Sequence, residues 1–351
     1  MPAVWRLLKF IKGNPKMEWA VNEAIFRSRR TGLAPDTLRL WQGSASVVLG
    51  TPSSFKDDVN HENCIKNGVE IVRANSVSPE VFYYDMGSLN FAFAIDTSEL
   101  KQFIENYQPV LSEYQLLNEC IAVGLNKKFR VTSKADATGV YINNKKVSES
   151  LQVWFYDYLL FQGTAHINTN LSIYNQVTRS KKQLTTLKLE IGEEIPVGEV
   201  INALVQGVEE KLDVKFNEQN ITEEEQKLIQ KLYRVKYRLD KWNISGREPF
   251  LIGMGKTTVE VFVAYPPTSK CRELIDLVKN VTSDLQNEVE IRVWMRGRGI
   301  NQHGPCPEIS PVLRYVEKHS TLPAIIINGE LKFSESIPSK EDLRKAILEV
   351  S

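Results

Sequence analysis

Residues 82–95 read FYYDMGSLNFAFAI and place a turn between two strand-forming runs. The runs 82–84 and 89–95 are rich in aromatic and other apolar residues, which favour strands. Between them, Asp85-Met86-Gly87-Ser88 supplies residue types that favour a turn. This pattern predicts a hairpin within a mostly antiparallel sheet.

The segments around this stretch alternate between helical and strand-like patterns. Apolar residues recur at helical spacing over 17–30, and strand-like runs cover 38–41, 46–49 and 69–72. Beyond the stretch, we expect a helix over 98–123, strands at 140–142 and 165–167, and a long connection over 145–161. Residues 1–191 are therefore predicted to form one α+β domain with a mixed sheet.

The pattern changes twice further along the chain. Residues 198–212 and 223–237 have helical patterns, and Thr222 and Glu225 have the spacing of a capping box, so 192–250 is expected to form a small helical accessory domain. A glycine-rich break follows at 243–257. Strand and helix patterns then alternate in the order β, α, β, α, β, β, α over 259–264, 270–286, 289–295, 311–319, 324–327, 330–333 and 340–350. This order predicts a separate α/β domain over 259–351.

Charge and cysteine content argue against several classes of function. The formal net charge is +1, so no overall field attracts nucleic acid or an anionic membrane. No apolar run approaches the ~18 residues of a membrane-spanning helix, and we expect a cytoplasmic protein. Cys64, Cys120, Cys271 and Cys306 form no CxxC pair and have no metal-ligand spacing. Free thiols and no metal centre are therefore expected.

Several short stretches occur in a familiar order between residues 37 and 243. They are Thr37-Leu38-Arg39-Leu40-Trp41, Tyr83-Tyr84-Asp85-Met86-Gly87-Ser88-Leu89-Asn90, Asn144-Lys145-Lys146-Val147-Ser148, Phe161-Gln162-Gly163-Thr164 and Lys241-Trp242-Asn243. Taken together, they resemble the lipoate–protein ligase family, whose members adenylate lipoic acid and pass it to a lysine of a carrier protein. The resemblance implies a lipoate/biotin ligase-like mixed sheet, with a ligase-like catalytic domain over 1–191 and the accessory domain over 192–250.

The resemblance also implies a site. Its central lysine corresponds to Lys146, because Val147 and Ser148 follow as in the family, and Lys145 is the local alternative. A fixed ammonium suits the chemistry, since joining a carboxylate to a phosphate brings two anions together and charge then builds on the carbonyl oxygen. The implied lining consists of Arg73, Tyr84, Asp85, Ser88, Asn90, Ser148, Gly163 and Thr164.

The implied ligands and partners follow from the same resemblance. The site would bind lipoate or lipoyl-AMP, with ATP and Mg²⁺ if the protein is an active ligase. The partner would be a lipoyl carrier protein, either GcvH-like or an E2 lipoyl domain, that receives lipoyl or octanoyl groups. No nucleic-acid or membrane partner is expected.

The chain departs from the family where a phosphate should bind. The family's glycine run corresponds to Ser78, Pro79 and Glu80; Pro79 lacks an amide donor, and Glu80 places a negative charge where an anion should sit. Tyr84 replaces a histidine of the family, and Glu149 replaces the glycine after the lysine motif. Two hypotheses stay open. One is an acyl-transferring enzyme of the ligase type, and the other is a catalytically degenerate ligase that binds a lipoylated carrier as a scaffold.

Residues 259–350 carry a second resemblance. Leu322-Pro323-Ala324 precedes a strand-like run, and Asn328-Gly329-Glu330 follows it, which is similar to a thioredoxin-like domain with its cis-proline and its Asn-Gly hairpin turn. After the first strand, Cys271 stands alone without a CxxC partner, which excludes dithiol exchange. Cys271 is a single redox candidate at a helix N-terminus, and the alternative is a fold used for docking.

Overall fold

The computed structural model describes residues 2–76, 78–108, 110–155, 157–246, 257–264, 266–285, 289–295, 300–301, 304–305, 322–328 and 330–348. Its internal contacts separate two compact units. The first consists of residues 1–233 and 237–246, and the second of residues 234–236 and 247–351. The expected break over 243–257 falls largely on residues outside the described ranges.

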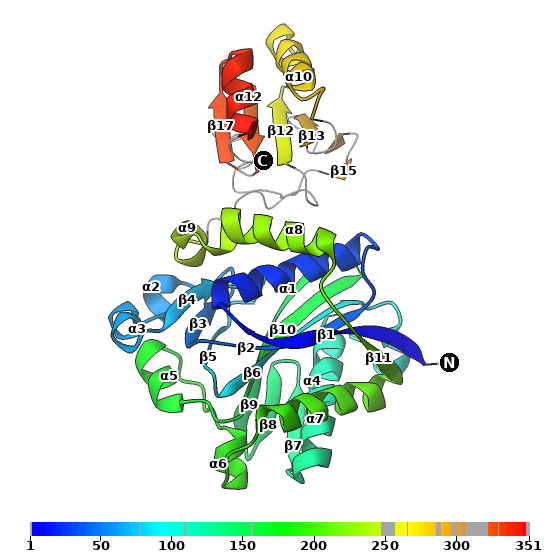
Figure 1. Ribbon diagram of the computed structural model, residues 1–351, viewed down its shortest axis with the longest axis vertical. Coiled ribbons are helices and arrows are strands. Elements are labelled where there is room, and N and C mark those ends of the chain that lie inside the picture. Colours follow the sequence, from blue (N-terminus) through cyan, green and yellow to red (C-terminus); the bar gives the residue numbers. More distant parts are fainter. Residues whose placement is uncertain are drawn as a thin grey trace. The chain divides into compact units, whose positions relative to one another are not determined.

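The first unit is built on an eight-stranded mixed sheet (Figure 1). The strand β1 runs parallel to both of its neighbours, whereas every other neighbouring pair in this sheet is antiparallel. The strands lie in the order β11 (Val214–Gln219), β1 (Ala3–Gly13), β2 (Thr37–Gly43), β6 (Ser88–Asp96), β10 (Tyr158–His166), β9 (Lys145–Phe155), β8 (Gly139–Ile142) and β7 (Ser133–Asp136). The expected mixed α+β architecture is confirmed.

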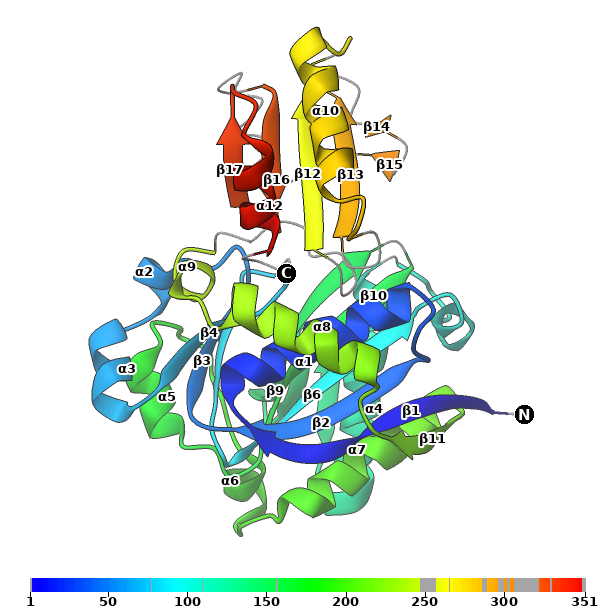
Figure 2. The same ribbon diagram turned by 45° about the horizontal axis from the view of Figure 1, so that its top comes forward.

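Helices cover both faces of this sheet. Apolar side chains of one face, such as Leu40, Phe91 and Phe161, form a buried core with α4 (Leu111–Phe129) and α7 (Val197–Leu212). The opposite face lies against α1 (Pro15–Arg30), which packs in turn on α8 (Glu223–Leu232) (Figures 1 and 2). We call this second surface the α1 face. The prediction of a helix over 17–30 is confirmed.

A second, three-stranded sheet lies in the same unit. Its strand order is β4 (Glu70–Arg73), β3 (Ser46–Leu49) and β5 (Val81–Tyr84). The first unit also contains the short helices α2 (Phe55–Asp58), α3 (His61–Asn67), α5 (Leu171–Val177) and α6 (Leu187–Ile191). The strand β5 pairs with β3, whereas β6 pairs with β2 and β10. The predicted hairpin over 82–95 is therefore wrong, because the turn carries the chain from one sheet to the other. Both strands are almost fully buried, so their apolar runs do not specify a partner.

Two further expectations are corrected. The predicted helix over 98–123 is a short 3₁₀ turn, η1 (Leu100–Phe103), followed by α4, which begins only at Leu111. The sequence contains Pro109 in this segment, and a proline disfavours a helical conformation at the residue before it. The predicted connection over 145–161 is the antiparallel pair β9 and β10. The residues between these strands do not strongly favour a turn, so the sequence did not indicate that the two strands pair.

Residues 192–233 and 237–246, from the segment expected to form the accessory domain, belong to the same compact unit as the large sheet. The helix α7 packs on α4, and β11 extends the large sheet beside β1. The close packing depends on Gly207, where a Cβ atom would lie 2.1 Å from the Cys120 carbonyl oxygen. The predicted capping box between Thr222 and Glu225 is present at the start of α8. After α8 the chain forms a π-helical turn, η2 (Tyr233–Tyr237), and the helix α9 (Asp240–Asn243). Periodicity identified the helices but not the surfaces on which they pack.

The second unit contains a four-stranded sheet in the order β13 (Val289–Met295), β12 (Thr257–Val263), β16 (Ala324–Ile327) and β17 (Glu330–Ser334). The strands β12 and β13 are parallel, and the other pairs are antiparallel. One face packs on α10 (Ser269–Val281) and α12 (Lys340–Leu348), and the strands β14 (Ile300–Asn301) and β15 (Gly304–Pro305) form a short pair. The Leu322–Pro323 peptide is cis, as expected. The helix expected over 311–319 and Cys306 lie outside the described residues.

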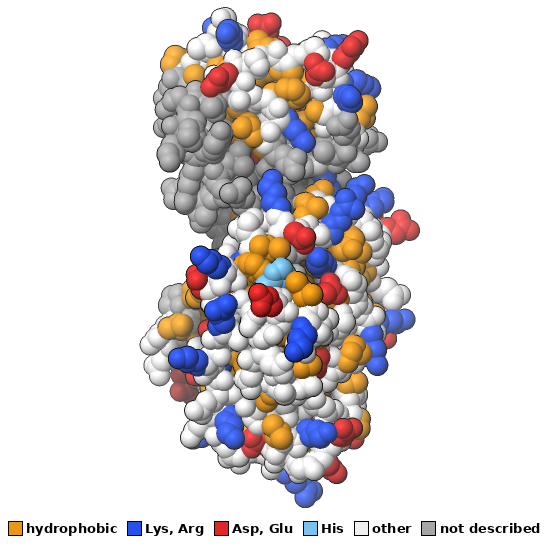
Figure 3. Space-filling model, turned by 90° about the vertical axis from the view of Figure 1, so that its left-hand side faces the viewer, with side chains coloured by type: hydrophobic (Ala, Val, Ile, Leu, Met, Phe, Trp, Pro, Cys, Tyr) orange, Lys and Arg blue, Asp and Glu red, His pale blue; other side chains and the backbone are white. Residues whose placement is uncertain are grey.

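Charged side chains of both signs are scattered over the surface that Figure 3 presents. This agrees with the formal net charge of +1. Among the described helices, none combines the length and the apolar content that crossing a bilayer requires.

Candidate functional site

The expected site residues gather where β6 begins, β10 ends and β9 begins. Strand register places Asn90 opposite Thr164 and Thr164 opposite Glu149, while Trp41 of β2 lies opposite Asn90 on its other side. Cross-strand partners point to the same face of a sheet. Because the neighbouring Phe91 lies in the α4 and α7 core, these four residues point to the α1 face.

This row contains buried polar atoms without partners. Both amide atoms of Asn90, the hydroxyl of Thr164 and the indole nitrogen of Trp41 are buried and have no hydrogen bond among the described residues. Leaving such a group unsatisfied costs roughly 1–3 kcal/mol. Native proteins contain few of these atoms, so a cluster in one row indicates a place where another molecule supplies the missing bonds.

Lys146 is buried close to this row, near the start of β9. Its side chain is 8% exposed, and its Nζ donates a hydrogen bond to the Thr138 carbonyl oxygen at 3.1 Å. The Nζ also lies 5.5 Å from the centre of the Tyr141 ring. No ion pair joins Lys146 to a carboxylate in the part of the chain that the structure describes. Lys145, the alternative, is exposed.

Ser148 and Gly163 support the strands rather than the α1 face. The Ser148 hydroxyl donates to the Thr164 carbonyl oxygen at 3.0 Å. A Cβ atom at Gly163 would lie 2.0 Å from the Glu149 carbonyl oxygen and 2.8 Å from the Phe91 ring. Only glycine therefore allows β9 and β10 to approach so closely.

The turn residues Tyr84 and Asp85 have mainly structural contacts. The Tyr84 hydroxyl accepts a hydrogen bond from the Trp19 indole at 3.3 Å, and its ring meets the Trp41 ring edge-on at 5.4 Å. Burial raises the pKa of Tyr84 above its ordinary value. The Asp85 carboxylate accepts from the Gly87 and Asn170 backbone amides at 2.8 and 2.9 Å, which fixes the turn between the two sheets.

Arg73 does not belong to this site. Its guanidinium donates to the carbonyl oxygens of Gly50, Thr51, Ser53, Trp242 and Ile244. It is buried, and burial lowers its pKa. Arg73 thus fastens the end of α9 and the residue after it to the small sheet.

Lys182, which the sequence did not reveal as a site residue, pairs with the two acidic residues that depart from the family pattern, Glu80 and Glu149. The Lys182 Nζ forms an ion pair with the Glu80 carboxylate, a second one with Glu149 at 2.9 Å, and a hydrogen bond to the Val81 carbonyl oxygen at 3.0 Å. We call Glu80, Lys182 and Glu149 the ion cluster. The Glu80 charge is thus paired with Lys182, and the cluster keeps one net negative charge. No motif singled out Lys182 in the sequence, because both of its acidic partners are distant along the chain.

The ion cluster determines the charge of Glu149. Burial opposes ionisation of this carboxyl, but Lys182 and then His166 outweigh burial and lower its pKa to about 2. For Lys182, burial opposes the charged form, whereas Glu149 and Glu80 raise its pKa above the ordinary value. The two groups consequently hold each other in the charged state at neutral pH.

A chain of polar contacts continues from Glu149. The other carboxylate oxygen lies 3.2 Å from His166 Nε2, and His166 Nδ1 lies 3.3 Å from the Thr169 hydroxyl. That hydroxyl lies 2.8 Å from the Ser88 hydroxyl. His166 was not predicted, because a single histidine in a strand pattern gives no signal of its own.

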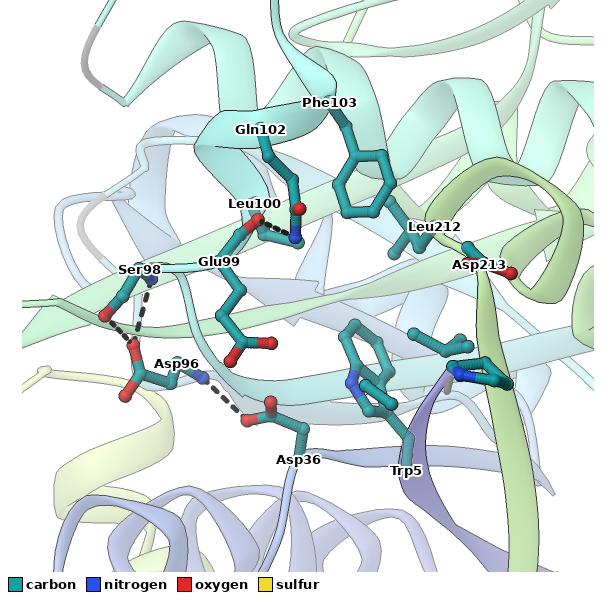
Figure 4. A pocket seen from close by; sticks show the side chains of 13 residues that line it. Trp5, Asp36, Asp96, Ser98, Glu99, Leu100, Gln102, Phe103, Leu212 and Asp213 are labelled. Atoms are coloured by element: carbon teal, nitrogen blue, oxygen red, sulfur yellow. Dashed lines mark hydrogen bonds between the residues drawn. The ribbon is translucent and has the colours of Figure 1, made fainter.

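Two cavities of the first unit bear on where the site lies. One, of about 250 Å³, lies beside the ion cluster and is lined by Lys145, Leu171, Tyr174, Asn175, Lys182, Gln183 and Leu184. A larger one, of about 550 Å³, lies near the opposite ends of β2 and β6 (Figure 4). Its acids Asp36 and Asp96 already pair with Arg29, and it contains none of the expected site residues. The chemistry therefore points to the end of the sheet that holds Lys146.

Cys271 lies at the start of α10 in the second unit. Its side chain is almost fully buried, and the Thr268 hydroxyl donates to its Sγ at 3.2 Å. Burial opposes the thiolate, but the hydrogen bonds outweigh burial and lower the pKa of Cys271. By contrast, burial raises the pKa of Cys64 to about 11. In the described ranges, no group of histidine, cysteine and acidic side chains has the arrangement of a metal site.

Comparisons with known proteins agree with this geometry. The family model of the lipoyl protein ligase A/B catalytic domain matches residues 14–209, which include most of α7. Lipoate-protein ligase A subunit 1 of Thermoplasma acidophilum is 25% identical over 260 residues, covering 68% of this chain and 95% of that protein. Octanoyltransferase LipM of Clostridioides difficile is 22% identical over 272 residues, covering 68% of this chain and 98% of that protein. A structure from a study of the bipartite lipoate protein ligase of T. acidophilum and its E2 lipoyl domain gives a TM-score of 0.62 at 22% identity, covering 71% of this chain and 100% of that one.

Proposed function

The chain belongs to the family of the lipoyl protein ligase A/B catalytic domain, and we propose that it attaches or otherwise handles lipoyl or octanoyl groups on a lipoyl carrier protein. The two relatives described above have names that refer to lipoate ligation and octanoyl transfer. The observation that carries the proposal is Lys146, a buried ammonium with no carboxylate partner among the described residues.

A buried ammonium without a carboxylate partner is costly, because its hydration is lost and no ion pair replaces it. Such a group is retained where an anion or a developing negative charge occupies the site during function. An acyl group under attack by an amine develops that charge on its carbonyl oxygen. Lys146 is therefore proposed as the catalytic lysine, with the row of Asn90 and Thr164 contributing to the binding of the acyl group.

The phosphate region fits ATP poorly. Pro79 has no amide donor, and Lys182 is already neutralised by Glu80 and Glu149, so it has no charge to offer a triphosphate. We therefore propose weak adenylation or none, with ATP, Mg²⁺ and lipoyl-AMP as ligands only if that step is retained. The same observation favours the second candidate function, a scaffold that binds a lipoylated carrier without reacting.

The partner is proposed to be a lipoyl carrier, either an E2 lipoyl domain or a GcvH-like protein. One structure similar to this chain comes from a study that includes an E2 lipoyl domain. The second unit is proposed to be a thioredoxin-like domain used for docking, and its strand order and its cis Leu322–Pro323 peptide support this. Its buried, single Cys271 is the remaining redox candidate.

The test is equilibrium binding of lipoate, octanoate, lipoyl-AMP and ATP to the full chain, run beside pyrophosphate release from ATP with lipoate. We expect the acids to bind, Lys146→Ala to weaken their binding, and the exposed control Lys145→Ala to leave it unchanged. Lipoate-dependent pyrophosphate release that disappears in Lys146→Ala would restore an ordinary ligase. Failure of every lipoyl and octanoyl species to bind would remove both candidate functions.

A further inference from the structure

We propose that Thr169 carries the acyl group as an ester during transfer, activated by His166 and Glu149. This inference rests on the proposed function and adds a nucleophile to it. Two contacts in a line support this proposal: the Thr169 hydroxyl lies 3.3 Å from His166 Nδ1, and His166 Nε2 lies 3.2 Å from the Glu149 carboxylate. We call Thr169, His166 and Glu149 the relay.

The relay has the order of groups that hydroxyl nucleophiles require. A hydroxyl is a weak nucleophile until a neighbouring base takes its proton, and the base works best when a carboxylate fixes its orientation. With Nε2–H donating to Glu149, the other ring nitrogen of His166 is free to accept the Thr169 proton. Lys182 keeps the Glu149 carboxylate ionised, so this tautomer is the one that the relay favours.

The relay shares the α1 face with unsatisfied donors. Asn90 lies two residues after Ser88 on β6, and Thr164 lies two residues before His166 on β10, so all four share the α1 face. The Asn90 amide and the Trp41 indole N–H have no partner. These are the donor types that stabilise the oxyanion of an acyl-transfer intermediate. A relay used only to hold a loop would not explain these unpartnered groups.

Thr169 is the hydroxyl best placed to act. Ser88 and His166 are completely buried, whereas Thr169 keeps 6% of its surface exposed at the end of the chain of contacts. Ser88 contacts Thr169 at 2.8 Å and accepts from the Asp85 amide at 3.2 Å, which positions the hydroxyl pair. Among the described cysteines, Cys64 and Cys120 are buried in hydrophobic clusters, so a thiol does not compete for this role in the first unit.

The reaction balances with an acyl thioester as donor. The Thr169 oxygen attacks the thioester carbonyl, the new O–C bond forms, the C–S bond breaks, and His166 passes the hydroxyl proton to the departing sulfur. The neutral amine of the carrier lysine then attacks the ester, forming the amide. The C–O bond breaks, and His166 returns a proton from the amine to the Thr169 oxygen. This route uses no nucleotide, which agrees with the poor fit of the ion cluster to a triphosphate.

The experiment mixes the full chain with octanoyl-coenzyme A and follows the protein by intact mass and peptide mapping. We expect one octanoyl group on the peptide that contains Thr169, held as an ester that alkaline hydroxylamine removes. Thr169→Val should abolish the adduct, Thr169→Ser should keep it, and His166→Gln should slow its formation by roughly 10²–10⁴-fold. Thr178→Val is the matched control, because Thr178 is also buried and its hydroxyl donates to the Tyr174 carbonyl oxygen at 3.1 Å rather than to a residue of the relay.

The outcomes separate this inference from the proposed function. Transfer of octanoate to a lipoyl domain at the wild-type rate by Thr169→Val would overturn the inference and leave the function standing. Absence of any adduct while octanoate or lipoate still binds would do the same. An adduct that maps to another residue, or that resists alkaline hydroxylamine, would also overturn it. Loss of all acyl binding in the wild type would instead remove the proposed function.

Discussion

Replacing Lys182 with methionine removes the ammonium that joins Glu80 to Glu149 and keeps most of the side-chain volume. Glu149 is 2% exposed, so its carboxylate would stay buried with only His166 as a partner. Breaking a buried ion pair by deleting one member typically costs about 3–5 kcal/mol, because the other charge is left uncompensated. Lys182 is 24% exposed, so water can replace part of its role. We therefore expect a loss of about 2–4 kcal/mol of unfolding free energy.

The same contacts determine how the unfolding free energy changes with pH. The folded-state pKa of Glu149 is about 2, below the ordinary value of 4.5. A carboxyl whose pKa is depressed contributes stability that is fully present above its unfolded pKa and is lost as the pH falls through the folded pKa. The wild type should therefore lose this contribution between about pH 4.5 and pH 2. In Lys182→Met, the unfolding free energy should depend less on pH in that window, because the pKa of Glu149 is lowered less when Lys182 is absent.

The assay is urea denaturation followed by tryptophan fluorescence. Five of the six tryptophans, at positions 5, 19, 41, 154 and 242, lie in the first unit, so the signal reports mainly on the unit that contains the ion cluster. Lys188→Met is the control, because Lys188 pairs with Glu194 on an exposed surface and such pairs contribute little. Adding Glu149→Gln to Lys182→Met should recover part of the lost stability, since it removes the unpaired charge.

Equally mild effects of Lys182→Met and Lys188→Met would contradict the expected cost of an uncompensated Glu149 carboxylate. A double variant no more stable than Lys182→Met would contradict it as well, because the cost would then come from lost packing. Equal acid slopes for wild type and Lys182→Met would show that another group causes the dependence.

Three further outcomes are expected. Gly207→Ala should destabilise the chain by about 1–3 kcal/mol in thermal unfolding, since its Cβ would lie 2.1 Å from the Cys120 carbonyl oxygen. Gly198→Ala in the same helix is the control, because its Cβ would meet nothing within 4 Å, and it should be neutral or slightly stabilising. Burial raises the pKa of Glu260 to about 7 from 4.5, so the second unit should lose about 3 kcal/mol of stability as the pH rises from about 4.5 to 7. Glu260→Gln should remove this dependence of the unfolding free energy on pH, measured by denaturation at several pH values. Insulin reduction by the full chain should be absent, and Cys271→Ser should cost only about 1 kcal/mol, because the hydroxyl can keep the contact with Thr268.

Local patterns in the sequence were sufficient for most elements. The helix α1 shows helical spacing, and the capping box of α8 has a fixed offset between Thr222 and Glu225, so both are visible within a few residues. The choice of strand partner is different, because it depends on contacts that are distant in sequence. The strand β5 pairs with β3 rather than with β6, although only a turn separates β5 from β6. A turn shows that the chain changes direction, but it does not show which sheet receives the next strand.

The candidate site shows the same limit for charge. Lys146, Asn90 and Thr164 could be placed by their motifs, because each lies within a short stretch that resembles the family. Lys182 could not be placed, since it meets Glu80 and Glu149 at separations of 102 and 33 residues. Without knowledge of this contact, Glu80 and Glu149 were interpreted as two unrelated departures from the family pattern.

The charges of the site decide which chemistry it suits. Glu80 and Glu149 together offset Lys182 and leave one further negative charge, while Lys146 remains without a carboxylate among the described residues. A triphosphate carries several negative charges, and this set of residues has one uncommitted cation to meet them. A single oxyanion on an acyl carbon needs only that one cation and a few oriented N–H donors. The unpartnered Asn90 amide and Trp41 indole supply such donors on the same face. The departures from the family pattern at Ser78, Pro79 and Glu80 are therefore compatible with acyl transfer, provided that the acyl group arrives already activated.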